Sequence, residues 1–331
     1  MDDCFVRRVD RSGGNDLMRV RNEQAAVVGA GRMGHGIALE LARGGYRVAI
    51  FDAKTGRAST AIMEAERDAS DLVEAGVIGQ GDIPKIIQRL SAEADLKTAV
   101  TGARVVFEAV AEDLEIKREV FVQLDQSAPV DALLLSNTSS IGISDIAAVC
   151  RQPERVALAH WILPPHLLPG GEVAPGRCTS EGTITAVCDL LEGIGKWPIV
   201  LKQELPGYLI NRLQFAMLRE AMDLVDRGVA SAEEIDRAIC GSISRRVPTM
   251  GIFGQADAAG LDVYHQIFRY LAPDLSRSTE PPSVLDRAVK AGHTGASAGQ
   301  GFYSWTESEI AEVMARRSAD LIRFLRADRN G

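Results

Sequence analysis

The sequence predicts an α/β protein, in which a doubly wound, mostly parallel sheet is followed by an all-helical C-terminal domain. Three observations support this fold class. Short continuous apolar runs alternate with helical stretches between residues 25 and 201, as is typical of strands buried on both faces. A glycine-rich turn directly follows the first run. Beyond residue 202 the runs stop, and apolar residues recur at helical spacing.

The apolar runs place the expected strands in order. They occupy residues 25–28, 47–51, 104–107, 132–135, 155–159 and 198–201. Helical segments separate most of these runs, which is the pattern of a parallel sheet. Residues 57–95 depart from simple alternation and predict a long helical excursion, punctuated by glycines and Pro84. We expect the first domain to span residues 24–203 and the second to span residues 204–331.

The second domain is predicted to be helical throughout. Apolar residues from Ile210 to Val225 fall at helical spacing, and Ser231-Ala-Glu-Glu234 is a capping box that opens another helix. Further helices are expected at residues 254–272, 283–291 and 306–327. Residues 1–23 mix arginines and aspartates without any period, which predicts a mobile arm.

Composition narrows the class of protein. The 331 residues are 46% hydrophobic and 25% charged, which is an ordinary globular mixture long enough for two domains. A net charge of −8 argues against nucleic-acid binding, since phosphate backbones attract basic surfaces. No apolar run approaches the roughly 20 residues of a membrane helix, and no signal peptide is visible. Five scattered cysteines predict reduced thiols in a cytoplasmic protein, and no metal site is expected.

The glycine-rich turn predicts a dinucleotide site. Its residues are Gly29, Ala30, Gly31, Arg32, Met33 and Gly34. The first glycine permits the tight turn, the second lets a pyrophosphate approach, and the third lets the helix pack closely. Asp52 ends the next run, 21 residues after Gly31, where an acid would accept hydrogen bonds from ribose hydroxyls and repel a 2′-phosphate. This combination favours NAD over NADP; the alternative is a turn that only joins a strand to a helix.

A histidine and a glutamate form the candidate acid/base pair. His160 follows the run 155–159, at the carboxyl edge where open α/β sheets bind ligands. Glu172 stands twelve positions later, beyond a segment rich in proline and glycine that could fold it back onto His160. A carboxylate on one ring nitrogen would orient the imidazole and raise its basicity. The alternative is a surface histidine and an unrelated glutamate. We expect His35 to pack on the first helix and His166 to line the pocket.

Together these segments resemble the 3-hydroxyacyl-CoA dehydrogenase family over about residues 24–305. The matching motifs are the glycine turn, Phe107-Glu-Ala-Val-Ala-Glu-Asp-Leu-Glu-Ile-Lys117, Ser136-Asn-Thr-Ser-Ser-Ile141, His160-Trp161 with Pro164-Pro165, Glu172-Val173, Pro206-Gly-Tyr-Leu-Ile-Asn-Arg-Leu213, Gly260-Leu-Asp262 and Gly299-Gln-Gly-Phe-Tyr303. The resemblance implies a Rossmann-type NAD-binding domain, and a helical second domain that forms a homodimer.

The resemblance also implies roles for individual residues. His160 would be the general base in alcohol oxidation, with Glu172 as its partner. Ser139 would hydrogen-bond the reacting oxygen, and Asn211 would help to hold the substrate carbonyl. Three further residues would contact the ribose and nicotinamide side of the cofactor, namely Glu112, Lys117 and Asn137. The substrate is expected to be a small molecule, and neither a nucleic acid nor a membrane is an expected partner.

Two features depart from the family pattern. Leu163 stands where the family has asparagine, and Gly170 and Gly171 stand where bulky apolar residues are usual. The excursion also resembles a lysine-rich hairpin that meets the CoA phosphates in acyl-CoA members. Between residues 57 and 79, however, two arginines face five carboxylates, which makes a poor phosphate receptor.

Three hypotheses follow for function. The leading hypothesis is NAD-dependent oxidation of an L-3-hydroxyacyl-CoA to the 3-ketoacyl-CoA. The second keeps the hydride chemistry but replaces the thioester with a small hydroxy acid or an aromatic hydroxymethyl or aldehyde carboxylate. The acidic excursion and Leu163 motivate it, and some relatives act on free acids, namely L-gulonate, carnitine and a pyridine carboxylate from vitamin B6 breakdown. The third is an NAD-binding protein without turnover, as in lens crystallins.

Overall fold

The computed structural model describes residues 23–330. The predicted N-terminal arm, apart from its last residue, lies outside this range. The described residues form two compact units: one ends at Arg212 and also includes residues from Met314 onward, and the other is Leu213–Val313.

An eight-stranded sheet organises the first unit, in the order β3-β2-β1-β4-β5-β6-β7-β8. The strands are β1 Gln24–Val28, β2 Arg47–Phe51, β3 Leu90–Glu93, β4 Ala103–Glu108, β5 Leu133–Ser136, β6 Val156–Trp161, β7 Gly170–Pro175 and β8 Trp197–Val200. All neighbours run parallel except β6 and β7, which are antiparallel. The predicted doubly wound sheet is therefore confirmed, although strand β3 interrupts the excursion that was expected to be helical throughout.

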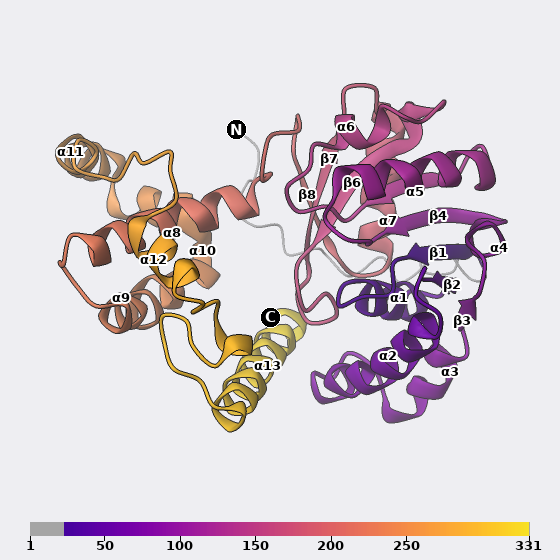
Figure 1. Ribbon diagram of the computed structural model, residues 1–331, viewed down its shortest axis with the longest axis horizontal. Helices are drawn as coiled ribbons and strands as arrows, with labels where there is room; N and C mark the ends of the chain where they lie inside the picture. The colour runs from indigo at the N-terminus through magenta and orange to yellow at the C-terminus, as the bar shows by residue number, and fades with distance from the viewer. Residues whose placement is uncertain (1–22, 331) are drawn as a thin grey trace. The chain divides into compact units, whose positions relative to one another are not determined.

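Helices cover both faces of this sheet (Figure 1). One face packs against α1 Gly34–Arg43, α2 Arg57–Glu74, α3 Ile83–Ile87 and α7 Glu181–Gly193. The other face packs against α4 Leu96–Val100, α5 Leu114–Ser127 and α6 Ile143–Ala147. Short 3₁₀ turns lie at η1 Gln80–Asp82 and η2 Pro153–Arg155. Strand side chains such as Ile50 and Phe107 are fully buried, and each such burial contributes roughly 1.5–3 kcal/mol.

The second unit is helical, as predicted. Its elements are α8 Ile210–Asp226, α9 Ala232–Ala238, the π-helical turn η3 Ile239–Ile243, α10 Ser244–Ala259, α11 Leu261–Leu271, α12 Ser283–Lys290 and η4 Ala296–Ala298. The Ser231 side chain caps α9 by accepting a hydrogen bond from the Glu234 N–H at 3.2 Å. The single helix expected at 254–272 is divided at Gly260, whose φ of 97° suits glycine.

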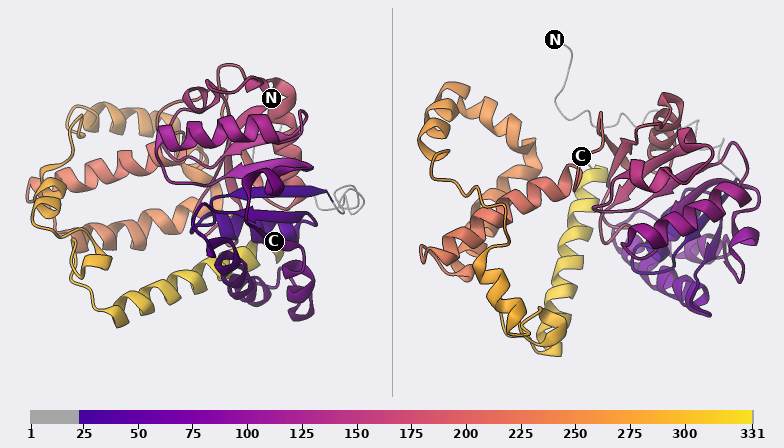
Figure 2. Two further views of the ribbon diagram at one scale, coloured as in Figure 1. Left: turned by 45° about the vertical axis from the view of Figure 1, so that its right-hand side comes forward. Right: turned by 45° about the horizontal axis from the view of Figure 1, so that its top comes forward.

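The last helix, α13 Glu307–Asn330, completes the first unit with its C-terminal part (Figure 2). Ile322 is 3% exposed and packs with Ala75 and Leu167. The Arg326 guanidinium donates to the carbonyl of Glu74, at the end of α2, at 2.8 Å. Among residues 23–330, no helix combines the length and apolar character that crossing a membrane requires.

Candidate active site

His160 and Glu172 lie directly opposite each other on β6 and β7. The segment between the two strands folds the chain back, as expected, and the antiparallel register then brings the two side chains together. His160 Nδ1 and Glu172 Oε2 are 2.7 Å apart, and the residues are 5% and 0% exposed. Cross-strand neighbours on one face of a sheet are held at side-chain contact distance, so the backbone itself fixes this pair.

The other carboxylate oxygen of Glu172 is held by the start of helix α8. Glu172 Oε1 accepts hydrogen bonds from the backbone N–H groups of Leu209 and Ile210, at 2.7 and 2.8 Å. Burial alone would raise the pKa of Glu172, but the His160 hydrogen bond and the two amides outweigh it and lower the pKa. The carboxylate is therefore ionised at neutral pH and can accept an Nδ1–H from His160, and in that tautomer Nε2 is an acceptor.

Tyr208 fixes the turn that presents these two amides. It is fully buried and has a φ of 50°, in the left-handed region that non-glycine residues rarely adopt. Its hydroxyl donates to the carbonyl of Ile141 at 2.6 Å, and its ring centroid lies 6.3 Å from that of His160. The sequence analysis missed this residue; its signal is the aromatic side chain directly after Pro206-Gly207, just before the helix begins.

Glu112 accepts several hydrogen bonds from the turn at residues 138–140. Its Oε1 accepts from the backbone N–H groups of Ser139 and Ser140 at 2.9 Å each, and from the Thr138 hydroxyl at 2.7 Å. The Ser139 hydroxyl is 3.2 Å from the same oxygen. Burial opposes ionisation, but the hydrogen bonds and the charge of Lys117 lower the pKa of Glu112 to about 2. Asn211 reaches the turn from α8, donating its Nδ2–H to the Ser139 carbonyl at 2.9 Å.

Lys117 and Asn137 lie beneath this turn. Lys117 is 1% exposed, and its Nζ is 2.7 Å from Glu108 Oε1 and 3.4 Å from Glu112 Oε2. Asn137 Oδ1 accepts the backbone N–H of Trp161 at 2.8 Å, which ties the end of β5 to the end of β6. The structure thus gathers Ser139, Asn211 and Glu112 in one cluster, with Lys117 enclosed behind it. Their contacts with cofactor and substrate stay predictions.

The glycine turn has the features that a dinucleotide requires. A Cβ on Gly29 would lie 2.5 Å from the Ala109 carbonyl oxygen, and one on Gly34 would lie 1.9 Å from the Gly29 carbonyl oxygen. A Cβ on Gly31 would meet nothing within 4 Å, so the turn is open at the glycine assigned to the pyrophosphate. Arg32 is exposed beside it, and Met33 directly precedes α1.

Asp52 is positioned against the same turn. Its Oδ2 accepts the backbone N–H of Ala30 and its Oδ1 accepts that of Lys54, both at 2.8 Å. These two bonds orient the carboxylate at the end of β2, and each oxygen keeps a further lone pair for a ribose hydroxyl. The residues present therefore fit NAD.

The loop between β6 and β7 is held by residues that the sequence analysis missed. Arg317 of α13 donates to the Leu163 carbonyl at 2.8 Å, just before the cis Leu163–Pro164 bond. Lys196 donates to the Leu168 carbonyl at 3.0 Å and also to that of Pro165. Both donors lie far from the loop in sequence, and no local pattern connects them to it.

The indole of Trp161 explains one of the departures from the family pattern. Trp161 lies opposite Gly171 across the two strands, and a Cβ on Gly171 would be 3.3 Å from the indole ring. The ring also packs edge-on against Phe107 and lies under Lys196 Nζ, 5.1 Å from the ring centroid. A bulky residue at 171 would require this ring to move.

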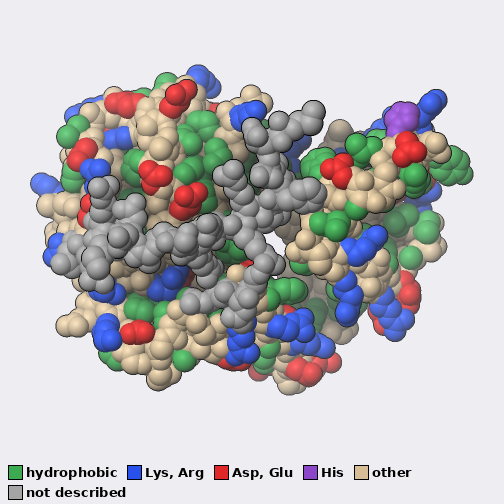
Figure 3. Space-filling view, turned by 180° about the vertical axis from the view of Figure 1, so that it is seen from behind, with side chains coloured by type: hydrophobic (Ala, Val, Ile, Leu, Met, Phe, Trp, Pro, Cys, Tyr) green, Lys and Arg blue, Asp and Glu red, His purple; other side chains and the backbone are tan. Residues whose placement is uncertain are grey.

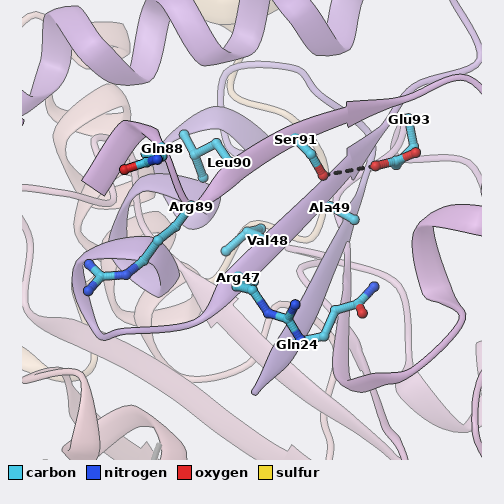
Figure 4. A pocket seen from close by; sticks show the side chains of 9 residues that line it. All are labelled: Gln24, Arg47, Val48, Ala49, Gln88, Arg89, Leu90, Ser91 and Glu93. Atoms are coloured by element: carbon cyan, nitrogen blue, oxygen red, sulfur yellow. Dashed lines mark hydrogen bonds between the residues drawn. The ribbon is translucent and has the colours of Figure 1, made fainter. Parts of the chain in front are cut away.

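A separate pocket lies at the opposite edge of the sheet (Figure 4). It has a volume of about 290 Å³ and includes the first residues of three strands, Gln24, Arg47 and Leu90. Parallel strands carry their functional side chains at the carboxyl edge, where His160 and the glycine turn lie. This pocket therefore does not belong to the candidate active site.

Comparison with known proteins identifies the family. The model of the 3-hydroxyacyl-CoA dehydrogenase NAD-binding domain matches residues 24–204, and that of the C-terminal domain matches residues 207–305. Two curated relatives cover most of the chain. The 5-formyl-3-hydroxy-2-methylpyridine 4-carboxylate 5-dehydrogenase of Mesorhizobium japonicum is 34% identical over 90% of this chain and 95% of its own. A probable 3-hydroxybutyryl-CoA dehydrogenase of Bacillus subtilis is 35% identical over 86% and 98%.

Solved structures give the same result. The structure of a 5-formyl-3-hydroxy-2-methylpyridine 4-carboxylic acid 5-dehydrogenase, described as an NAD⁺-dependent dismutase, superposes with a TM-score of 0.87 at 31% identity, covering 93% of this chain and 98% of that one. The (S)-3-hydroxybutyryl-CoA dehydrogenase of Ralstonia eutropha superposes with a TM-score of 0.71 at 27% identity, covering 86% and 99%. The chain therefore belongs to the 3-hydroxyacyl-CoA dehydrogenase family and is an NAD-dependent oxidoreductase.

Proposed function

We propose that this enzyme oxidises a hydroxyl group, or a hydrated aldehyde, on a small carboxylate substrate that carries no CoA, with His160 as the general base. The observation that carries the reaction is the buried His160–Glu172 pair at the carboxyl edge of the sheet. Bound NAD supplies a nicotinamide ring that accepts the hydride from the carbinol carbon. A hydroxyl group gives the carbonyl compound, NADH and one proton, and a hydrated aldehyde gives the carboxylic acid, NADH and one proton.

The proton of the reacting hydroxyl is transferred to a residue of the chain itself. The neutral His160 ring donates its Nδ1–H to Glu172, and its Nε2 takes the proton of the reacting hydroxyl. Glu172 stabilises the imidazolium that results, because its carboxylate is ionised and held by two backbone amides. Ser139 and Asn211 are proposed to hold the reacting oxygen, while Asp52, Glu112 and Asn137 hold the ribose and nicotinamide side of NAD, and the enclosed Lys117 acts through its pairing with Glu112.

The charge on α2 favours a free acid over a CoA thioester. The helix presents Asp68 and Asp71 to His166, in the loop that joins the two catalytic strands. Carboxylates beside this loop repel the phosphates of CoA. The higher TM-score of the pyridine-carboxylate enzyme, 0.87 against 0.71 for the Ralstonia enzyme, supports the same choice.

The second candidate is oxidation of an L-3-hydroxyacyl-CoA to the 3-ketoacyl-CoA. It is favoured by the match of both family domain models and by the Bacillus subtilis relative, whose identity of 35% is similar to that of the pyridine-carboxylate enzyme. In this candidate His160 and Glu172 keep the same roles, and the thioester binds through residues other than the α2 carboxylates.

A substrate panel separates the candidates. Purified enzyme with NAD is given aliphatic hydroxy acids, aromatic hydroxymethyl and formyl carboxylates, and 3-hydroxybutyryl-CoA, and NADH formation is followed by absorbance. We expect NADH with a free carboxylate only, and at least about a hundredfold slower formation in the His160→Gln control. NADH with the thioester alone would establish the second candidate. NADH binding without turnover of any compound would leave an NAD-binding protein.

We also propose that the enzyme is a cytoplasmic homodimer. In residues 213–313, Met222 is the one buried side chain, while Phe253 and Tyr270 are 82% and 85% exposed. Figure 3 shows apolar side chains on the surface of this helical unit. Apolar surface of this extent is typical of a protein–protein interface, and we propose that a second copy of the chain binds there. Light scattering of the wild-type protein should give twice the mass of one chain. The Phe253→Glu variant should give a lower mass.

A further inference from the structure

His35 lies directly beneath the glycine turn. It is the second residue of α1, next to Gly34, and is 8% exposed. Its Nδ1 is 3.0 Å from the carbonyl oxygen of Gly31, the glycine at which the turn is open. Its Nε2 is 2.9 Å from Asp68 Oδ2 on α2. The ring therefore connects the dinucleotide turn to the acidic helix.

Both ring nitrogens of His35 face groups that only accept hydrogen bonds. A carbonyl oxygen has no proton to donate, and neither has an ionised carboxylate. Glu64 Oε2 lies 3.4 Å from Nδ1 and is a third acceptor. A ring that donates from both nitrogens is an imidazolium. Burial lowers the pKa of His35, but the Asp68 hydrogen bond and charge, the Gly31 carbonyl and Glu64 outweigh it and raise the pKa.

The two carboxylates next to this ring, Glu64 and Asp68, also contact other basic side chains. On α2, Arg57 pairs with Glu64 at 2.6 Å and Arg67 pairs with Asp68 at 3.2 Å. From the β6–β7 loop, His166 approaches, with its Nδ1 3.6 Å from Asp68 Oδ2 and its Nε2 3.2 Å from Asp71. On the turn itself, Arg32 is exposed. Deprotonating His35 therefore leaves the carboxylates of Asp68 and Glu64 less balanced close to the turn.

We propose that the His35 imidazolium is part of the NAD pyrophosphate site and makes NAD affinity depend on pH. The pyrophosphate of a bound dinucleotide lies at the N-terminus of the helix that follows such a turn, where helix amides already attract anions. A buried cation one residue inside that helix adds to the same field, and the low local dielectric makes its charge effective. Affinity is highest while His35 is protonated and falls as the pH rises through its raised pKa.

Binding of ADP-ribose tests this proposal without the reaction. ADP-ribose has the pyrophosphate but no nicotinamide, so His160 does not face it. Its Kd is measured by calorimetry between about pH 5.5 and pH 9, a window that spans histidine titration. We expect the wild-type Kd to rise by roughly three- to tenfold across this range. In His35→Gln, the Kd should equal the wild-type high-pH value and should not change with pH.

Two further variants separate charge from structure. Asp68→Asn keeps an acceptor for Nε2–H but removes the carboxylate, so the midpoint of the Kd profile should move to lower pH by roughly one unit or more. A purely structural role for Asp68 would weaken binding at every pH without moving the midpoint. Glu66→Gln removes an exposed charge from the same helix and should leave the midpoint where it is.

NMR gives a direct reading of the ring in the wild-type protein. The His35 signals are those absent from the His35→Gln spectrum, and they should titrate above the ordinary histidine value. The proposal is overturned by a wild-type Kd for ADP-ribose that does not change with pH, by titration of His35 at or below that value, or by an unshifted profile in Asp68→Asn. Should His35→Gln not fold, the wild-type profile and Asp68→Asn still decide. None of these outcomes depends on which substrate the enzyme oxidises.

Discussion

Two histidine–carboxylate pairs lie in the NAD-binding unit and differ in what the second ring nitrogen faces. His160 Nδ1 is 2.7 Å from Glu172, and His35 Nε2 is 2.9 Å from Asp68. Both rings are buried, at 5% and 8% exposure. Nε2 of His160 makes no hydrogen bond within residues 23–330, whereas Nδ1 of His35 is bound to the Gly31 carbonyl.

This difference corresponds to two proposed roles: proton transfer for His160, and a positive charge near the glycine turn for His35. A ring with one nitrogen on a carboxylate and the other exposed to a ligand can take up and release a proton during each turnover. A ring whose two nitrogens both donate to fixed acceptors keeps its proton during turnover and changes its charge only when the pH changes. In the roles proposed for them, the two histidine–carboxylate pairs serve different functions, and the contact of the second nitrogen distinguishes them.

The largest effect is expected at His160. In His160→Gln the acceptor for the hydroxyl proton is lost, so kcat should fall by roughly two to four orders of magnitude. The Kd for ADP-ribose should stay at the wild-type value, because the ring lies away from the pyrophosphate turn. Steady-state kinetics and calorimetry on one preparation measure both. Loss of ADP-ribose binding in this variant would assign His160 a structural role instead.

Replacing the partner of His160 should have a smaller but distinctive effect. In Glu172→Gln the amide places an N–H toward Nδ1, which favours the ring tautomer that cannot accept a proton at Nε2. We expect kcat to fall by about two orders of magnitude. The lowered pKa of Glu172 means that its ionisation stabilises the fold above its ordinary value of about 4.5, and that this stabilisation is lost as the pH falls through the lowered pKa. The melting temperatures of variant and wild type should therefore converge in acid; a constant difference would contradict this.

Asp52, which accepts a hydrogen bond from Ala30 in the glycine turn, provides a third test. Asp52→Asn removes a charged acceptor for ribose hydroxyls, so the Kd for NAD should rise by roughly tenfold or more. The preference for NAD over NADP should fall with it, because the repulsion of a 2′-phosphate is also lost. Dissociation constants for both cofactors measure this, with kcat at saturating NAD as the control. An unchanged preference would contradict the assignment of Asp52.

The smallest effect concerns stability at the His35 pair. Because the pKa of His35 is raised, its protonation stabilises the fold fully below the ordinary value of about 6.5, and this contribution is lost as the pH rises through the raised pKa. Asp68→Asn should therefore lower the melting temperature by about 2–4 °C near pH 6 and by less near pH 9. Calorimetry at several pH values measures the difference. A larger deficit at high pH would reverse the sign and contradict the cationic state.

The sequence predicted most of the sheet because its central strands are continuous apolar runs. Strand β3, Leu90–Glu93, was missed because an edge strand with polar residues carries no such run. The turn glycines and Asp52 were placed correctly against each other, since their spacing reflects a local strand–turn–helix unit. Glu172 was named as the partner of His160, but the register that pairs them comes from antiparallel strands that sequence alone could not align.

Long-range contacts explain what was not predicted. His35 was expected to pack on its own helix, yet its Nε2 also contacts Asp68, 33 residues away, and this carboxylate helps to raise its pKa. Lys196 and Arg317 hold the β6–β7 loop from positions 28 and 154 residues from the carbonyls they bind. Such partners are fixed by tertiary packing, and neither periodicity nor motif spacing records them.

The tail of α13 has a practical consequence. The family domain models end at residue 305. Beyond it, Ile322 packs against Ala75 and Leu167, and Arg317 donates a hydrogen bond to the carbonyl of Leu163. A shortened chain that stops at residue 305 would expose an apolar patch next to the loop that joins β6 and β7, the strands of His160 and Glu172. Trimming, tagging or fusing this protein at its carboxyl terminus therefore touches the dehydrogenase unit itself, although that unit begins some 300 residues earlier.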